Sequence, residues 1–69
     1  MEKAPNGMDR PKVKLVGQDG NAFVIMGLCQ RALKAAKFPQ SDIDKFYDEC
    51  TSGDYNHLLC TAMTWCDVH

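Results

Sequence analysis

Apolar residues recur every three or four positions in three separate stretches of this chain, which is the spacing of one face of an α-helix. The stretches cover residues 25–36, 43–50 and 55–66. Pro39 falls between the first two, and Gly53 falls between the last two. Because proline and glycine commonly stand just beyond helix ends, the pattern predicts three helices.

Residues that can cap helices stand where these stretches begin. Asn21, Ser41 and Asp54 each precede a helical pattern and can accept a hydrogen bond from a free backbone N–H of its first turn. Gly53 can end the second helix in the left-handed conformation that other residues avoid. Gly27 is less expected, because a glycine inside a helix costs about 1 kcal/mol relative to alanine. We therefore expect another element, such as the ring of the single tryptophan, to approach the backbone there.

The two ends of the helical region contain short segments that fit strands. Residues 12–16 alternate polar and apolar side chains and are bounded by Pro11 and Gly17, which is typical of a short strand. A lone strand needs a partner, and three are open: residues 66–69, residues 22–26 as a hairpin, or a second copy of the chain. Residues 22–26 also fit the start of the first helix, which the long helical pattern favours. We predict pairing with residues 66–69.

These elements define the predicted fold class and domain. It is a mainly-α α+β domain in which three helices are closed by a short N-terminal strand paired with a short C-terminal strand. Residues 1–11 contain two prolines and a glycine without periodicity, which indicates a flexible tail. Residues 12–69 are then a single small domain, since 69 residues allow no second core.

The redox state of the cysteines is inferred from the cellular compartment that the sequence indicates. No apolar run approaches the roughly 20 residues of a membrane span, and the N-terminus lacks the apolar centre of a signal peptide. We expect a cytoplasmic protein, in which thiols stay reduced. The cysteines are therefore predicted to be free and mostly buried as small hydrophobic residues. They are Cys29, Cys50, Cys60 and Cys66.

The cysteines and histidines do not combine into a recognisable metal or catalytic site. His57 and Cys60 stand three positions apart, as do Cys66 and His69. Structural zinc sites usually pair such ligands across a loop, and a thiol nucleophile with its base needs a third group that orients the imidazole. We therefore predict a non-enzymatic protein with no catalytic residue, no metal ligand and no cofactor. A small metal-binding or thiol protein is the third-ranked function.

The start of the first helix carries more apolar residues than one buried face requires. The extra residues are Phe23, Val24 and Met26. An exposed apolar patch of this kind usually marks a partner surface, whereas burial against the chain's own tail and strands is the alternative. We predict a small domain that acts through protein–protein contacts, with a second copy of the chain as a candidate partner.

The distribution of charge supplies the alternative function. The chain has 8 Lys and Arg against 9 Asp and Glu, for a net charge of −1, whereas proteins that bind phosphates normally carry a basic excess. Nucleic acid is therefore not the expected partner, and neither a membrane nor a small-molecule substrate is indicated. A nucleic-acid-associated accessory protein becomes possible if the first strand and the first helix share a basic face. The residues of that patch are Lys12, Lys14, Arg31, Lys34 and Lys37.

Three short motifs carry a resemblance to other sequences. They are VKLVG at residues 13–17, DGNAF at residues 19–23, and TSGDY at residues 51–55 followed by HLL at residues 57–59. With these motifs the chain resembles a group of short uncharacterised bacterial and phage-associated proteins over residues 12–65. The group has no assigned activity, so the resemblance implies no catalytic or binding residue.

Overall fold

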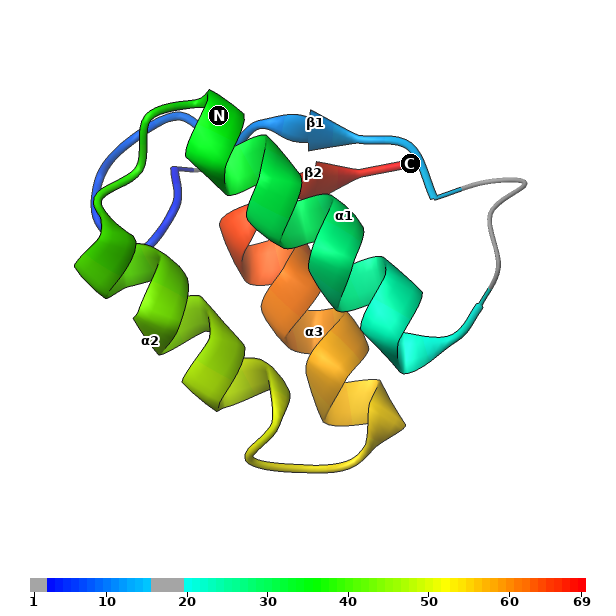
Figure 1. Ribbon diagram of the computed structural model, residues 1–69. Coiled ribbons are helices and arrows are strands. Elements are labelled where there is room, and N and C mark those ends of the chain that lie inside the picture. The colour runs from blue at the N-terminus through cyan, green and yellow to red at the C-terminus, as the bar shows by residue number, and fades with distance from the viewer. Residues whose placement is uncertain (1–2, 16–19) are drawn as a thin grey trace.

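Three helices enclose one core, and two short strands lie side by side at one edge of it (Figure 1). The structure is a computed structural model that describes residues 3–15 and 20–69. The elements follow the order β1 (Lys12–Val13), α1 (Ala22–Ala35), α2 (Gln40–Cys50), α3 (Tyr55–Trp65) and β2 (Asp67–Val68). The predicted mainly-α α+β class is confirmed, and residues 22–26 belong to a helix and not to a hairpin.

The strands pair in parallel, with Lys12 opposite Asp67 and Val13 opposite Val68. Backbone bonds extend the contact on both sides, from Asp67 N–H to the Pro11 carbonyl at 2.8 Å and from His69 N–H to the Val13 carbonyl at 3.0 Å. Parallel strands need a long crossover connection, and here the three helices supply it. The predicted strand was longer, but Lys14 and Leu15 fall outside β1, and Val16 lies outside the described residues.

The segment before β1 differs from the predicted flexible tail. Its described part, residues 3–11, forms a turn in which the Ala4 N–H bonds the Met8 carbonyl at 2.8 Å. Ala4 is 4% exposed and joins the core. Asn6 donates a hydrogen bond to Asp42 of α2 at 2.8 Å, and Arg10 donates one to the Met63 carbonyl of α3 at 2.7 Å. One buried alanine and two polar contacts therefore hold this segment against the helices.

The helix starts confirm two of the three predicted caps. The side chain of Asn21 accepts a bond from the Phe23 N–H at 2.8 Å, and Asp54 accepts one from the His57 N–H at 2.9 Å. The prediction for Ser41 is wrong, because α2 already begins at Gln40 and its N-cap is Pro39, without a side-chain cap bond.

The ends of α1 and α2 are not formed by a glycine in the left-handed conformation, which is the usual way to end a helix. Thr51 caps α2, and its hydroxyl donates to the Tyr47 carbonyl at 3.0 Å. The predicted left-handed conformation of Gly53 is wrong, because Gly7 is the glycine with positive φ among the described residues. At the end of α1 the left-handed residue is Lys37, with φ 69°. The Phe38 N–H reaches back to the Leu33 carbonyl at 3.0 Å, which is the Schellman arrangement usually built on glycine.

Gly27 does not mark a close approach, so that prediction is also wrong. A Cβ built there would meet nothing within 4 Å, and the residue lies exposed on α1. The Trp65 ring packs elsewhere, with its centroid 6.3 Å from that of Phe38 and 6.1 Å from that of Phe46. Its Nε1–H donates to the Glu49 carboxylate at 2.9 Å, which satisfies the one polar group of this buried ring.

The core collects the apolar faces of all three helices. Its largest fully buried side chains are Trp65, Phe46, Leu33, Cys29 and Cys66. All four cysteines are free, and Cys60 is the exposed one. Within residues 3–15 and 20–69, no helix has the length and apolar character that a membrane span requires.

Candidate functional site

The exposed face of α1 carries two of the three residues predicted to form a partner surface. Phe23 is 75% exposed and Val24 is 37% exposed. Met26 is only 4% exposed and packs in the core, because it lies one helical turn before Cys29 and two turns before Leu33, on the buried side. The predicted patch is therefore divided, and its exposed part is centred on Phe23.

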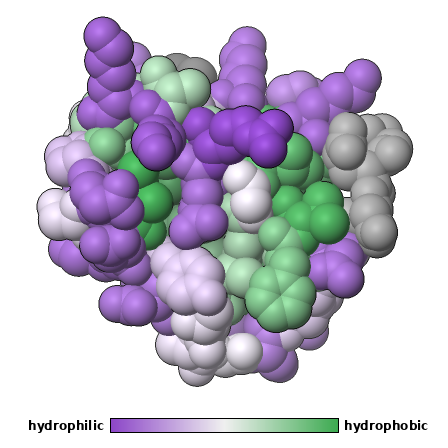
Figure 2. All heavy atoms as spheres, viewed as in Figure 1, coloured by the Kyte–Doolittle hydropathy of each residue, from purple (hydrophilic) through white to green (hydrophobic). Residues whose placement is uncertain are grey.

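A groove opens beside Phe23, between the start of α1 and the α2–α3 loop. Its volume is about 310 Å³. We call it the aromatic groove, and its lining residues are Ala22, Phe23, Met26, Cys50, Thr51, Gly53, Asp54, Tyr55 and Leu58. Tyr55, at 45% exposed, stands with Phe23 at the edge, while Met26 and Leu58 are buried and form the floor. Figure 2 shows apolar surface gathered among hydrophilic side chains on the face that carries α1.

Hydrogen bonds hold both walls of the aromatic groove in place. The Tyr55 hydroxyl donates to the Gly20 carbonyl at 2.7 Å and so ties the start of α3 to the segment before α1. On the loop side, Ser52 donates to the Glu49 carbonyl at 2.9 Å, and its oxygen lies 3.1 Å from His57 Nε2. A Cβ on Gly53 would stand 2.9 Å from the His57 Cβ, so this approach of the imidazole requires glycine.

Residues of two quoted sequence motifs meet at this groove. DGNAF contributes Ala22 and Phe23, whereas TSGDY contributes Thr51 and Tyr55 among its lining residues. Tyr55 was not predicted as a surface residue, because its position fits the third helical pattern. The available signal was its place directly after the capping Asp54, because side chains in the first turn of a helix often stay partly exposed.

The Ser52–His57 pair does not have the arrangement of an activated nucleophile. The Ser52 hydroxyl donates to the Glu49 carbonyl, so its hydrogen is directed away from the imidazole, whereas a general base must face the proton that it removes. The pair instead fixes the α2–α3 loop. Among the described residues, no group of three or more His, Cys, Asp or Glu side chains is placed to hold a metal ion.

Two of the three buried thiols, those of Cys50 and Cys66, are held in their protonated form. A hydrogen bond with Cys29, and then burial, raise the pKa of the Cys66 thiol above its ordinary value. Burial raises the pKa of Cys50 to about 12. Since the thiolate is the nucleophile and the metal ligand, Cys50 and Cys66 act as packing groups at neutral pH. The hydrogen bond with Cys66 lowers the pKa of the third buried thiol, Cys29.

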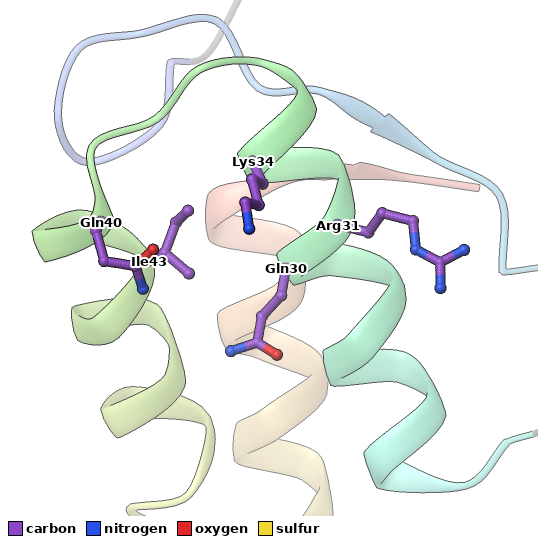
Figure 3. A pocket seen from close by; sticks show the side chains of 5 residues that line it. All are labelled: Gln30, Arg31, Lys34, Gln40 and Ile43. Atoms are coloured by element: carbon purple, nitrogen blue, oxygen red, sulfur yellow. The ribbon is translucent and has the colours of Figure 1, made fainter.

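A second candidate surface lies where β1 meets α1. A groove of about 330 Å³ has Lys12 and Lys14 on its strand side and Arg31 on its helix side. Arg31 also borders a groove of about 340 Å³ between α1 and α2, together with Lys34. Figure 3 shows Gln30 between these two helices, whereas Arg31 points to the side of α1 away from α2.

The structure thus brings together four of the five residues of the predicted basic patch. We call Lys12, Lys14, Arg31 and Lys34 the basic strip. Lys37 is exposed after the end of α1 but lines neither groove. Among the residues that the structure describes, no acidic residue lines either groove.

No family model, no curated protein and no solved structure matches this chain.

Proposed function

We propose that this chain is a small non-enzymatic protein-association domain that pairs with a second copy of itself through the aromatic groove. The observation that carries this proposal is the position of Phe23, which is 75% exposed at the edge of an apolar groove of about 310 Å³. Burying a phenylalanine side chain contributes about 1.5–3 kcal/mol. A surface that leaves such a side chain in water gains that free energy when a partner covers it.

The surface is complementary to itself. A twofold dimer uses the same patch on both subunits, and here a protruding ring stands directly beside a groove. In such a dimer Phe23 of each copy enters the groove of the other. An apolar cavity of roughly 150 Å³ holds a benzene ring, so the volume of the groove is sufficient.

The chemistry of the groove also fits a protein interface. Interfaces are enriched in Phe, Tyr and Met, and polar side chains surround their apolar centre. The groove combines Phe23, Tyr55 and Met26 with Thr51 and Asp54. A specific interface buries about 1,000 Å² or more in total, or about 500 Å² for each copy, which is a small part of the 4500 Å² surface of this chain. We expect a dissociation constant on the order of micromolar, at the weak end of such interfaces.

A non-enzymatic role is supported by the side chains that sequence reasoning considered for chemistry. The His57 imidazole is bonded to Ser52 and not to Cys60, and the pKa values of two buried thiols, Cys50 and Cys66, are raised. We also propose kinship with the short bacterial and phage-associated proteins that share the motifs. The support for this is the sequence of the motifs themselves, at residues 13–17, 19–23 and 51–59.

Sedimentation equilibrium over a range of protein concentrations tests the proposed function. The parent chain should associate to a dimer, and Phe23→Ala should weaken the association at least tenfold, because truncating a central aromatic residue commonly costs about 2 kcal/mol or more. Met63→Ala is the matched control, since Met63 is 53% exposed on α3 and lines no part of the aromatic groove. A chain that stays monomeric at millimolar concentration, or a Phe23→Ala variant that still dimerises fully, refutes the proposal. Binding of a different protein at the same groove would also refute self-association.

A further inference from the structure

The basic strip lies on a part of α1 that the aromatic groove does not use. Lys12 and Lys14 are two positions apart in an extended segment, so both side chains lie on one face while Val13, at 5% exposed, enters the core. Arg31 faces them across the groove. Lys34 follows one helical turn later on α1, about 4.5 Å along the axis. The four cations therefore form a row in which Arg31, which lines both grooves, lies between the two lysines that precede α1 and Lys34.

The charges of this row are not neutralised within the described chain. Over residues 3–15 and 20–69, none of the four cations forms an ion pair, and the pair that does form joins Lys3 to Asp9. Residues 22–35 include no Asp or Glu. Four of the acids lie instead on α2, at Asp42, Asp44, Asp48 and Glu49, while Asp67 of β2 lies opposite Lys12. The net charge of −1 thus conceals an uneven distribution, in which α1 carries only basic charges and α2 is mainly acidic.

The grooves beside Arg31 add shape and chemistry to this charge. The floor of the first groove is apolar and is formed by Val13, Leu28, Ala32 and Ala35. The second groove contains the amide of Gln30, which can donate hydrogen bonds to oxygen atoms, and that of Gln40, which already donates one to Asp44 at 2.9 Å. Arg31 stands between the grooves, and a guanidinium can bind a phosphate through two parallel hydrogen bonds.

We propose that the basic strip binds the sugar–phosphate backbone of single-stranded nucleic acid. Phosphates contact the cations, Arg31 binds the phosphate between the two grooves, and a sugar with its unstacked base lies on the apolar floor. A basic groove that follows the backbone and offers apolar contact to bases is the usual design for binding single strands. A duplex keeps its bases stacked and presents a rigid cylinder, so it cannot place a base on that floor. An acidic peptide would match the charge but has no planar base for the apolar floor.

Fluorescence anisotropy of a short labelled oligothymidylate over a salt series tests this inference. Four neutralised phosphates on a single strand predict a slope of log K against log salt of about −3. Arg31→Ala should weaken binding on the order of tenfold at low salt, as for the loss of a hydrogen-bonded charge, and should flatten the slope by about 0.7. Lys45→Ala is the matched control, because Lys45 is an exposed cation on the acidic helix α2. Far-UV circular dichroism confirms that each variant is folded.

Four outcomes would overturn the inference: no binding at low salt, equal affinity for a duplex of the same length, unchanged binding by Arg31→Ala, or displacement of the oligonucleotide by an equal charge of polyglutamate. The proposed self-association does not enter this test, because it uses Phe23 and the start of α1. Failure of one proposal leaves the other to be judged by its own experiment.

Discussion

Gly27 gives the sharpest test of what limits the stability of this fold. It lies within Ala22–Ala35, it is exposed, and a Cβ there would meet nothing within 4 Å. Alanine therefore restricts the unfolded backbone without a clash, and the full helix-propensity difference of about 0.8–1.0 kcal/mol should be gained. For 69 residues the entropy of unfolding is about 145 cal/mol/K, at about 2.1 per residue. Gly27→Ala should then raise the Tm by about 6 °C.

Thermal unfolding followed by far-UV circular dichroism measures this change. The experiment is run first in dilute solution, where a weak dimer is dissociated. An unchanged or lower Tm there would refute the reasoning, because it would mean that something in the folded chain contacts Gly27. The same measurement at high protein concentration examines the dimer. If the rise in Tm disappears when the chains associate, the partner subunit packs against this part of α1.

Two further predictions concern packing elsewhere in the molecule. Gly53→Ala should destabilise the fold by about 1–3 kcal/mol in urea unfolding, because its Cβ would stand 2.9 Å from the His57 Cβ; the cost should shrink in a His57→Gly background, which removes the opposing Cβ, and a full cost there would contradict this cause. In a thiol titration of the native protein, Cys60 should react fast while Cys29, Cys50 and Cys66 react only on unfolding, since these three are buried. Cys60→Ser should remove the fast phase, and equally fast reaction of a second thiol would contradict the described core.

Local rules accounted for much of the secondary structure. The caps at Asn21 and Asp54 could be predicted because a capping bond reaches only two or three residues along the chain. Lys37 could not be predicted to adopt a left-handed conformation, since glycine is the usual residue there and the tertiary burial of Phe38 decides the outcome. The docking of Ala4 likewise depends on a core that exists only after the helices have packed.

The candidate site was predictable only in part. The exposure of Phe23 follows from its place off the buried stripe of the first helix. The same helical spacing groups Met26 with Cys29 and Leu33, so its burial could have been inferred. The aromatic groove could not, because Tyr55 reaches it from α3 through a contact with Gly20 that lies 35 positions away in the sequence. The basic strip depended in the same way on the pairing that places β1 beside α1.

The parallel pairing of β1 with β2 has a consequence for how the molecule assembles. Each helix can form from neighbours in the sequence, whereas the two strands meet only when the entire helical bundle has brought them together. Contacts between such distant residues form late, because a long loop must close first. Until that moment β1 presents unpaired backbone groups, which can bond the equivalent strand of another molecule. In newly made chains at high local concentration, β1 can therefore pair with a strand of another molecule before it pairs with β2 of its own chain.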